Sequence, residues 1–128
     1  KRHRDVEGLI HFAASKAVGE SVEKPLLYYE NNLTSLVYLL QELSKLPKAH
    51  FIFSSSCTVY GQADEMPIDE NTPLKEAESS YGKTKQMGED ILKDFSRAYN
   101  KKVSLLRYLI LIYYLPCFAL CGQFVTRF

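Results

Sequence analysis

The residues best suited to chemistry lie in the stretch from Phe51 to Lys85, which begins FIFSSSCTVYG and ends SSYGKTK. Tyr81 and Lys85 are four residues apart, so on a helix both side chains lie on one face. A positive charge beside a phenol stabilises the phenolate and lowers a pKa that is ordinarily about 10. Ser56, at the end of an apolar run, adds a hydroxyl that can share the proton of a substrate alcohol. The combination predicts proton transfer, although a tyrosine and a lysine at this spacing alone are usually a surface pair.

Apolar patterns predict the elements that position these residues. Short apolar runs indicate buried parallel strands, and apolar residues at spacings of three and four indicate helices. The predicted strands are 6–14, 50–55 and 103–108, the predicted helices are 26–46 and 80–99, a helical turn covers 18–24, and 62–78 is a surface loop. Connections this long are crossovers, which are right-handed. The sequence therefore predicts an α/β protein with three layers, a parallel sheet between helices.

Composition excludes several classes of protein. A chain of 128 residues suits one domain, and 16 basic against 15 acidic residues give no charge imbalance that would favour nucleic acid. Cys57, Cys117 and Cys121 form neither an even disulfide framework nor a metal-ligand pair, so we expect free thiols in a reducing cytoplasm and no metal. No signal peptide is visible, because the chain opens with charged residues.

The C-terminal segment from Tyr108 to Thr126 carries no charged residue, which meets the length criterion for a membrane span. Pro116, Gly122 and Gln123 interrupt it, and its first residues already belong to the third predicted strand. A buried strand running into an apolar tail is the preferred interpretation, and a membrane anchor is the weaker alternative.

The positions of the glycines do not match the glycine-rich motifs that bind dinucleotide phosphates. The six glycines contain neither G-x-G-x-x-G nor G-x-x-G-x-x-G, the turns that hold a dinucleotide pyrophosphate at a helix N-terminus. The 128 residues thus contain no recognisable phosphate-binding turn.

Three segments, HFAASKAVGESVEKPLLYYENN, FIFSSSCTVYG and SSYGKTK, together resemble the UDP-glucose (UDP-galactose) 4-epimerase family of the extended short-chain dehydrogenase/reductase superfamily. The resemblance covers about Asp5 to Tyr108. It implies that residues 1–108 are a partial, Rossmann-like NAD-binding domain, a doubly wound parallel sheet that lacks the N-terminal glycine-rich half. Residues 109–128 are then an apolar tail unlike the family, because Leu109 to Leu111 stand where the family continues Phe-Asn-Pro.

The resemblance also implies roles for individual residues. Tyr81 corresponds to the catalytic base, Lys85 to the lysine that lowers its pKa, and Ser56 to the hydroxyl that contacts the sugar 4-OH. The reaction would be transient oxidation of C4 of a UDP-sugar by tightly held NAD. The implied cofactor contacts are Phe12, Ala13, Ala14, Ser15, Lys16, Asn31, Ser54, Ser55, Ser56, Tyr81, Lys85 and Tyr108. The implied substrate contacts are Lys16, Ser56, Thr58 and Tyr81.

Several alternatives stay open. Another NAD-dependent nucleotide-sugar epimerase or a dehydratase is possible, although the dehydratase branch has an acid pair after the threonine of its strand-end motif and Cys57, Thr58 and Val59 offer none. The family implies a cytoplasmic homodimer. A non-catalytic fragment that associates through the exposed edge of its first strand is the other alternative. We expect the 128-residue chain alone to be inactive, because the pyrophosphate cradle and the uridine pocket are missing.

Overall fold

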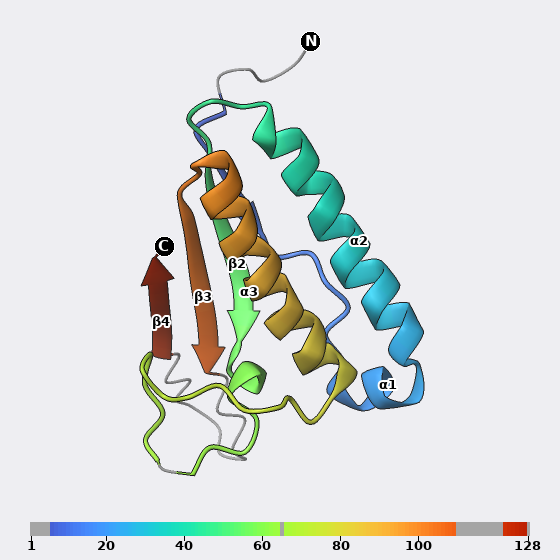
Figure 1. The fold of residues 1–128 in the computed structure, drawn as a ribbon. Coiled ribbons are helices and arrows are strands. Elements are labelled where there is room, and N and C mark those ends of the chain that lie inside the picture. Colours follow the sequence, from blue (N-terminus) through green and yellow to red (C-terminus); the bar gives the residue numbers. More distant parts are fainter. Residues whose placement is uncertain (1–5, 65, 110–121, 128) are drawn as a thin grey trace, which may run out of the picture.

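The computed structural model describes residues 6–64, 66–109 and 122–127, with backbone alone for 109 and 122–127. In chain order, the elements are β1 (Gly8–His11), α1 (Val18–Glu23), α2 (Pro25–Ser44), β2 (His50–Ser56), the 3₁₀ turn η1 (Cys57–Tyr60), α3 (Ser80–Tyr99), β3 (Val103–Leu109) and β4 (Gly122–Arg127). Figure 1 shows their arrangement. The predicted order of strands and helices is confirmed.

One sheet joins the described strands in the order β1-β2-β3-β4. β1, β2 and β3 are parallel, with Phe51 opposite Val103 and Ser55 opposite Arg107. β4 pairs with β3 in the antiparallel direction, from Ser104 opposite Arg127 to Leu109 opposite Gly122. The sequence predicted the three parallel strands but treated β4 as part of an apolar tail. Because β1, β2 and β3 point the same way, their carboxyl ends meet at one edge of the sheet.

The two long helices lie side by side on one face of the sheet (Figure 1). Two right-handed crossovers that proceed in the same direction across a sheet place both helices on the same face. The described elements therefore supply two of the three predicted layers. The core lies between them, and its buried residues are Leu36, Leu40, Leu43, Ala49, Phe51, Phe53, Leu92, Phe95, Val103 and Leu105.

Local signals determine where α3 begins and ends. The Ser79 hydroxyl accepts a hydrogen bond from the Gly82 N–H at 3.1 Å, which caps the N-terminus. Asn100 ends the helix in the left-handed conformation, with φ of 50°. These boundaries agree with the predicted helix 80–99 and place Tyr81 in the first turn.

A glycine lets α3 approach β2 closely. A Cβ atom at Gly88 would lie 2.9 Å from Cζ of Phe53, closer than side-chain atoms approach one another. The absence of a side chain there lets the helix settle against the strand, so that the residues one turn earlier reach the strand end.

No helix among the described residues is long and apolar enough to cross a membrane. The proposed anchor, Tyr108 to Thr126, falls mainly on residues 110–121, which lie outside the described residues. The described residues on either side of that gap belong to strands β3 and β4.

We predict that Leu92→Ala lowers the free energy of unfolding by about 2–5 kcal/mol, because Leu92 is fully buried in the core and truncation leaves a cavity. Leu26→Ala is the matched control: Leu26 is 79% exposed, so its loss should change stability by about 0.5 kcal/mol or less. Urea unfolding of both variants measures the difference. Equal effects at the two positions would contradict the described core.

Candidate functional site

A cleft of about 720 Å³ lies at the carboxyl ends of the parallel strands. Four segments line it: the loop after β1, the end of β2 with η1, the first turns of α3, and the end of β3. The lining residues are Phe12, Ala14, Lys16, Ala17, Val18, Ser54, Ser55, Ser56, Cys57, Thr58, Tyr81, Lys85 and Tyr108. Open α/β sheets bind ligands at this edge.

Lys85 is the most unusual charge in the cleft, because its side chain is almost entirely buried, with 4% of the residue exposed. Its Nζ donates to the Ser54 carbonyl at 2.8 Å and lies 4.8 Å from the ring centroid of Phe53. Within the described residues no carboxylate pairs with it. Burial therefore lowers the pKa of Lys85 from 10.5 to about 8.

Tyr81 lies one helical turn before Lys85, whose Nζ is 5.7 Å from the Tyr81 ring centroid. Burial raises the pKa of the Tyr81 phenol, a hydrogen bond with the Ser56 side chain lowers it, and the nearby Cys57 raises it again. The net effect is a raised pKa for Tyr81, because desolvation outweighs the hydrogen bond. The prediction that this pKa is lowered is therefore wrong for the chain without a bound cofactor.

Ser56 connects this pair to the strand end. Its Oγ accepts hydrogen bonds from the Thr58 hydroxyl at 3.1 Å and from the Thr58 N–H at 3.3 Å. The same oxygen is the hydrogen-bond partner of Tyr81. The structure thus brings Ser56, Tyr81 and Lys85 together, as the arrangement for proton transfer requires.

Most of the remaining predicted site residues also line the cleft, but three do not. Ala13, Ser15 and Asn31 lie outside the lining. The Asn31 side chain instead donates to the Ser15 hydroxyl at 2.8 Å. The aromatic rings of Phe12 and Tyr108, both in the lining, are neighbours with centroids 6.4 Å apart and a tilt of 39° between their planes.

Sequence reasoning missed Asn32, the neighbour of Asn31. Its Oδ1 accepts from the Ser15 N–H at 2.8 Å, and its Nδ2 donates to the Ser15 carbonyl at 3.0 Å and to the Thr84 hydroxyl at 3.1 Å. Asn32 therefore ties the cleft-lining loop to both long helices. Its spacing from Leu36 places it on the buried face of α2, so a polar residue on that apolar face was the available signal.

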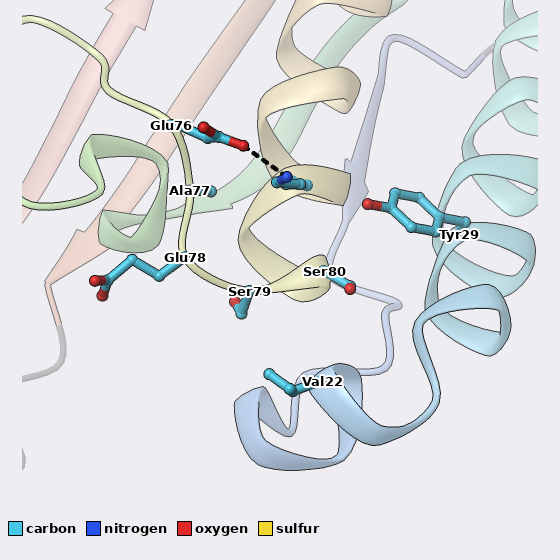
Figure 2. A pocket seen from close by; sticks show the side chains of 8 residues that line it. Val22, Tyr29, Glu76, Ala77, Glu78, Ser79 and Ser80 are labelled. Carbon is cyan, nitrogen blue, oxygen red and sulfur yellow. Dashed lines mark hydrogen bonds and ion pairs between the residues drawn. The ribbon is translucent and has the colours of Figure 1, made fainter.

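A second pocket, of about 400 Å³, opens between α1, α2 and the segment before α3 (Figure 2). Val22 and Tyr29 line one side, and residues 76–80 line the other. Lys83, which also lines it, is paired with Glu76 at 2.8 Å. The lining of this second pocket contains no arrangement like that of Tyr81 beside Lys85, in which a potential base lies next to a cation without a described carboxylate partner. The cleft at the strand ends is therefore the candidate active site.

The part of the chain that the structure describes contains no group of three or more His, Cys, Asp or Glu side chains placed to hold a metal ion. His11, near Lys85, packs against the rings of Phe51 and Phe53, with centroid distances of 6.0 and 6.1 Å.

Comparison with known proteins identifies the family. The model of the family described as GDP-mannose 4,6 dehydratase matches residues 2–110. The chain belongs to this family. Within it, the chain is 50% identical over 105 residues to UDP-glucose 4-epimerase of Bacillus subtilis (strain 168), a match that covers 81% of the chain and 31% of the relative. It is 48% identical over 103 residues to UDP-glucose 4-epimerase 2 of Arabidopsis thaliana, which covers 80% and 29%.

Solved structures of this family share the fold. UDP-glucose 4-epimerase from Brucella ovis in complex with NAD aligns with a TM-score of 0.77 at 40% identity, over 81% of this chain and 32% of that one. The enzyme from Bifidobacterium longum in complex with NAD+ and UDP aligns with a TM-score of 0.78 at 45% identity, with the same coverage. The predicted resemblance and the Rossmann-like α/β class are confirmed. The chain spans about a third of the length of these relatives.

The buried lysine makes stability depend on pH. The pKa of Lys85 is about 8 in the folded chain and near 10.5 when exposed, so between these values the unfolded chain binds more protons and stability rises with pH. We predict that the folded chain gains about 2 kcal/mol between about pH 7.5 and about pH 9.5 relative to Lys85→Met. Urea unfolding at both pH values measures this, and parallel pH profiles for the two proteins would contradict the buried ammonium.

Proposed function

We propose that this chain carries the catalytic residues of a UDP-glucose 4-epimerase, which interconverts UDP-glucose and UDP-galactose by transient oxidation at C4 with NAD. The observation that carries the proposal is the grouping of Ser56, Tyr81 and Lys85 at the edge of one cleft. The identity of about half of the residues with named epimerases supports it.

The residues of the cleft fit part of a dinucleotide. Within the described residues, the Lys85 ammonium donates one hydrogen bond, to Ser54, so N–H groups are left for ribose hydroxyls in the cleft. The rings of Phe12 and Tyr108 add apolar surface to the cleft. The 128 residues contain no glycine-rich turn for the pyrophosphate. When bound, NAD would supply the site that takes the hydride from C4 and returns it.

In this proposal, Tyr81 accepts the proton of the sugar 4-OH, and Ser56 holds that hydroxyl through the oxygen that already contacts Tyr81. Lys85 supplies positive charge one helical turn away. The raised pKa of Tyr81 means that the phenolate needs more positive charge than the chain alone provides. When the sugar is reduced again, Tyr81 returns the proton to the C4 oxygen.

Dehydration is the second candidate, because the matching family is described as a GDP-mannose 4,6 dehydratase. Removing water across C5 and C6 requires a further base and an acid for the leaving hydroxyl. The lining of the cleft includes no aspartate or glutamate. Besides Tyr81 and Lys85, its ionisable groups are Lys16, Cys57 and Tyr108. The lack of a carboxylate favours epimerisation over dehydration.

We predict that Tyr81→Phe lowers kcat for UDP-galactose by about 10²–10⁴-fold, because the variant lacks the proton acceptor. The assay uses a hybrid enzyme in which residues 5–108 replace the matching segment of the Bacillus subtilis relative, and UDP-glucose formation is followed enzymatically. Tyr99→Phe, at a 54% exposed position of the same helix, is the matched control.

Product mass separates the two reactions, because epimerisation leaves the mass unchanged and dehydration removes one water. A hybrid that forms UDP-glucose equally well with Phe at position 81 would overturn the proposal. The 128-residue chain alone should show no turnover, for want of a phosphate-binding turn.

We further propose that a second copy of the chain covers the outer face of α2 and α3. A groove of about 250 Å³ between these helices is lined by Val37, Leu40, Gln41, Ile91, Asp94, Phe95, Ala98 and Tyr99. Two of these lining residues, Val37 and Tyr99, are exposed in the monomer, and exposed apolar side chains that lie together favour association.

Val37→Glu should therefore shift the chain toward monomer, since a charge would be buried at the contact. Val22→Glu, on α1 and 62% exposed, is the control that should leave the association unchanged. Light scattering coupled to size exclusion measures both. A monomeric parent chain at high concentration would contradict the dimer.

The proposal also includes a boundary between residues 1–108 and 109–128. It further includes a cytoplasmic location. The family match that ends at residue 110 supports treating 1–108 as part of the NAD-binding domain and 109–128 as a tail unlike the family, although β4 within that tail pairs with β3. The free thiol of Cys57 supports a reducing compartment.

A further inference from the structure

Glu89 is a fully buried carboxylate that the proposed reaction does not use. It lies on α3, one turn after Lys85, and both of its oxygens are hydrogen-bonded. Oε1 accepts from the Ser55 hydroxyl at 2.6 Å and from Arg107 Nε at 3.0 Å, and Oε2 accepts from Arg107 Nη2 at 2.7 Å. Helix α3, strand β2 and strand β3 thus meet at one side chain.

Arg107 extends these contacts to the turn that lines the cleft. Its Nη1 donates to the Tyr60 hydroxyl at 3.0 Å, and its guanidinium carbon lies 5.1 Å from the Tyr60 ring centroid. Tyr60 is the last residue of η1, the turn that contains Cys57 and Thr58. The Glu89 carboxylate raises the pKa of Arg107, so the guanidinium stays charged.

Three successive residues of β2 are each bonded to a different turn of α3. The Ser54 carbonyl accepts from Lys85, the Ser55 hydroxyl donates to Glu89, and the Ser56 hydroxyl contacts Tyr81. One helix turn spans about 5.4 Å and one strand residue about 3.3 Å, so the two repeats do not coincide. If the helix slides along the strand by one turn, these three contacts are therefore lost together. The Glu89 contact is the only one of these three that is made by a fully buried charge.

We propose that Glu89, together with Ser55 and Arg107, positions α3 on β2 so that Tyr81 and Lys85 face Ser56 across the cleft. This inference rests on the proposed function, which gives Ser56, Tyr81 and Lys85 their catalytic roles. Glu89 does not line the cleft, so it is a positioning residue.

A buried ion pair is a poor device for stability alone. Desolvation of both charges offsets much of their attraction, and apolar residues of similar volume often stabilise a protein as well or better. The pair instead fixes the orientation of the two side chains, because a carboxylate facing a guanidinium accepts two parallel hydrogen bonds in one geometry. The site gains from that orientation, since proton transfer depends on distances within a fraction of an ångström.

The test measures the titration of Lys85 in the intact 128-residue chain by NMR of ¹³C-labelled lysine. The titratable side chains around Lys85 include His11 on β1 and Tyr81 and Glu89 on its own helix. Burial and the Lys85 charge lower the pKa of His11, so neither His11 nor Tyr81 carries charge near neutral pH. The charge of Glu89 is paired with that of Arg107 from β3. A helix that is no longer held on the strand lets water reach the ammonium, which shifts its pKa upward.

Ser55→Ala should raise the pKa of Lys85 from about 8 by about one unit or more, and Ser55→Thr, which keeps the hydroxyl, should restore it. Ser104→Ala is the matched control: Ser104 is a buried serine on β3 whose hydroxyl contacts His50 at 3.0 Å, and its loss should leave Lys85 unchanged. Glu89→Gln would leave the Arg107 cation without its carboxylate partner, and an uncompensated positive charge by itself lowers the pKa of a nearby ammonium, so that variant does not isolate the effect of position. Ser55→Ala decides, because it leaves the Glu89–Arg107 pair intact.

A lower unfolding midpoint in Ser55→Ala with the Lys85 pKa still at about 8 would overturn the positioning role and leave a purely structural contact. The titration requires no turnover. Failure of epimerase activity would therefore refute the proposed function, while the lysine signal would still decide this inference.

Discussion

The rest of the site depends on one desolvated cation, the ammonium of Lys85. Only 4% of the residue is exposed, and no described carboxylate pairs with the charge. Its described contacts include a strand carbonyl and two aromatic rings. Such a group costs free energy in the folded chain. Natural proteins retain that cost where a perturbed group serves chemistry, and this one lies beside a phenol and a serine in an open cleft.

Much of this fold could be predicted from the sequence, because local signals and apolar periodicity agree along most of the chain. Helix α3 is the clearest case, since Ser79 caps it and Asn100 ends it where expected. Strand β4 was not predicted, because it lies at the end of a long uncharged segment and its own residues show no alternation of polar and apolar side chains typical of a strand.

The candidate site was predictable in a different way. Ser56, Tyr81 and Lys85 were found because their types and spacing imply chemistry. Glu89 and Arg107 were not, since a charged residue on an amphipathic helix or near a strand end looks solvent-exposed until its partner is known. Asn32 was missed for the same reason, although its place on the buried face of α2 could have revealed it. Sequence patterns do not identify buried polar residues whose hydrogen-bond partners are distant in the sequence.

The two hydrogen bonds that Asn32 donates through Nδ2 have a consequence for the order of folding. They join Ser15 to α2 across 17 residues and Thr84 to α2 across 52, so the second contact closes a long loop of chain. Long loops close late, because their entropy is lost before distant contacts compensate for it. The cleft wall after β1 therefore acquires its final position only when α3 has docked. A partly folded chain can join Ser15 to α2 through Asn32 and still lack the side of the cleft that α3 supplies.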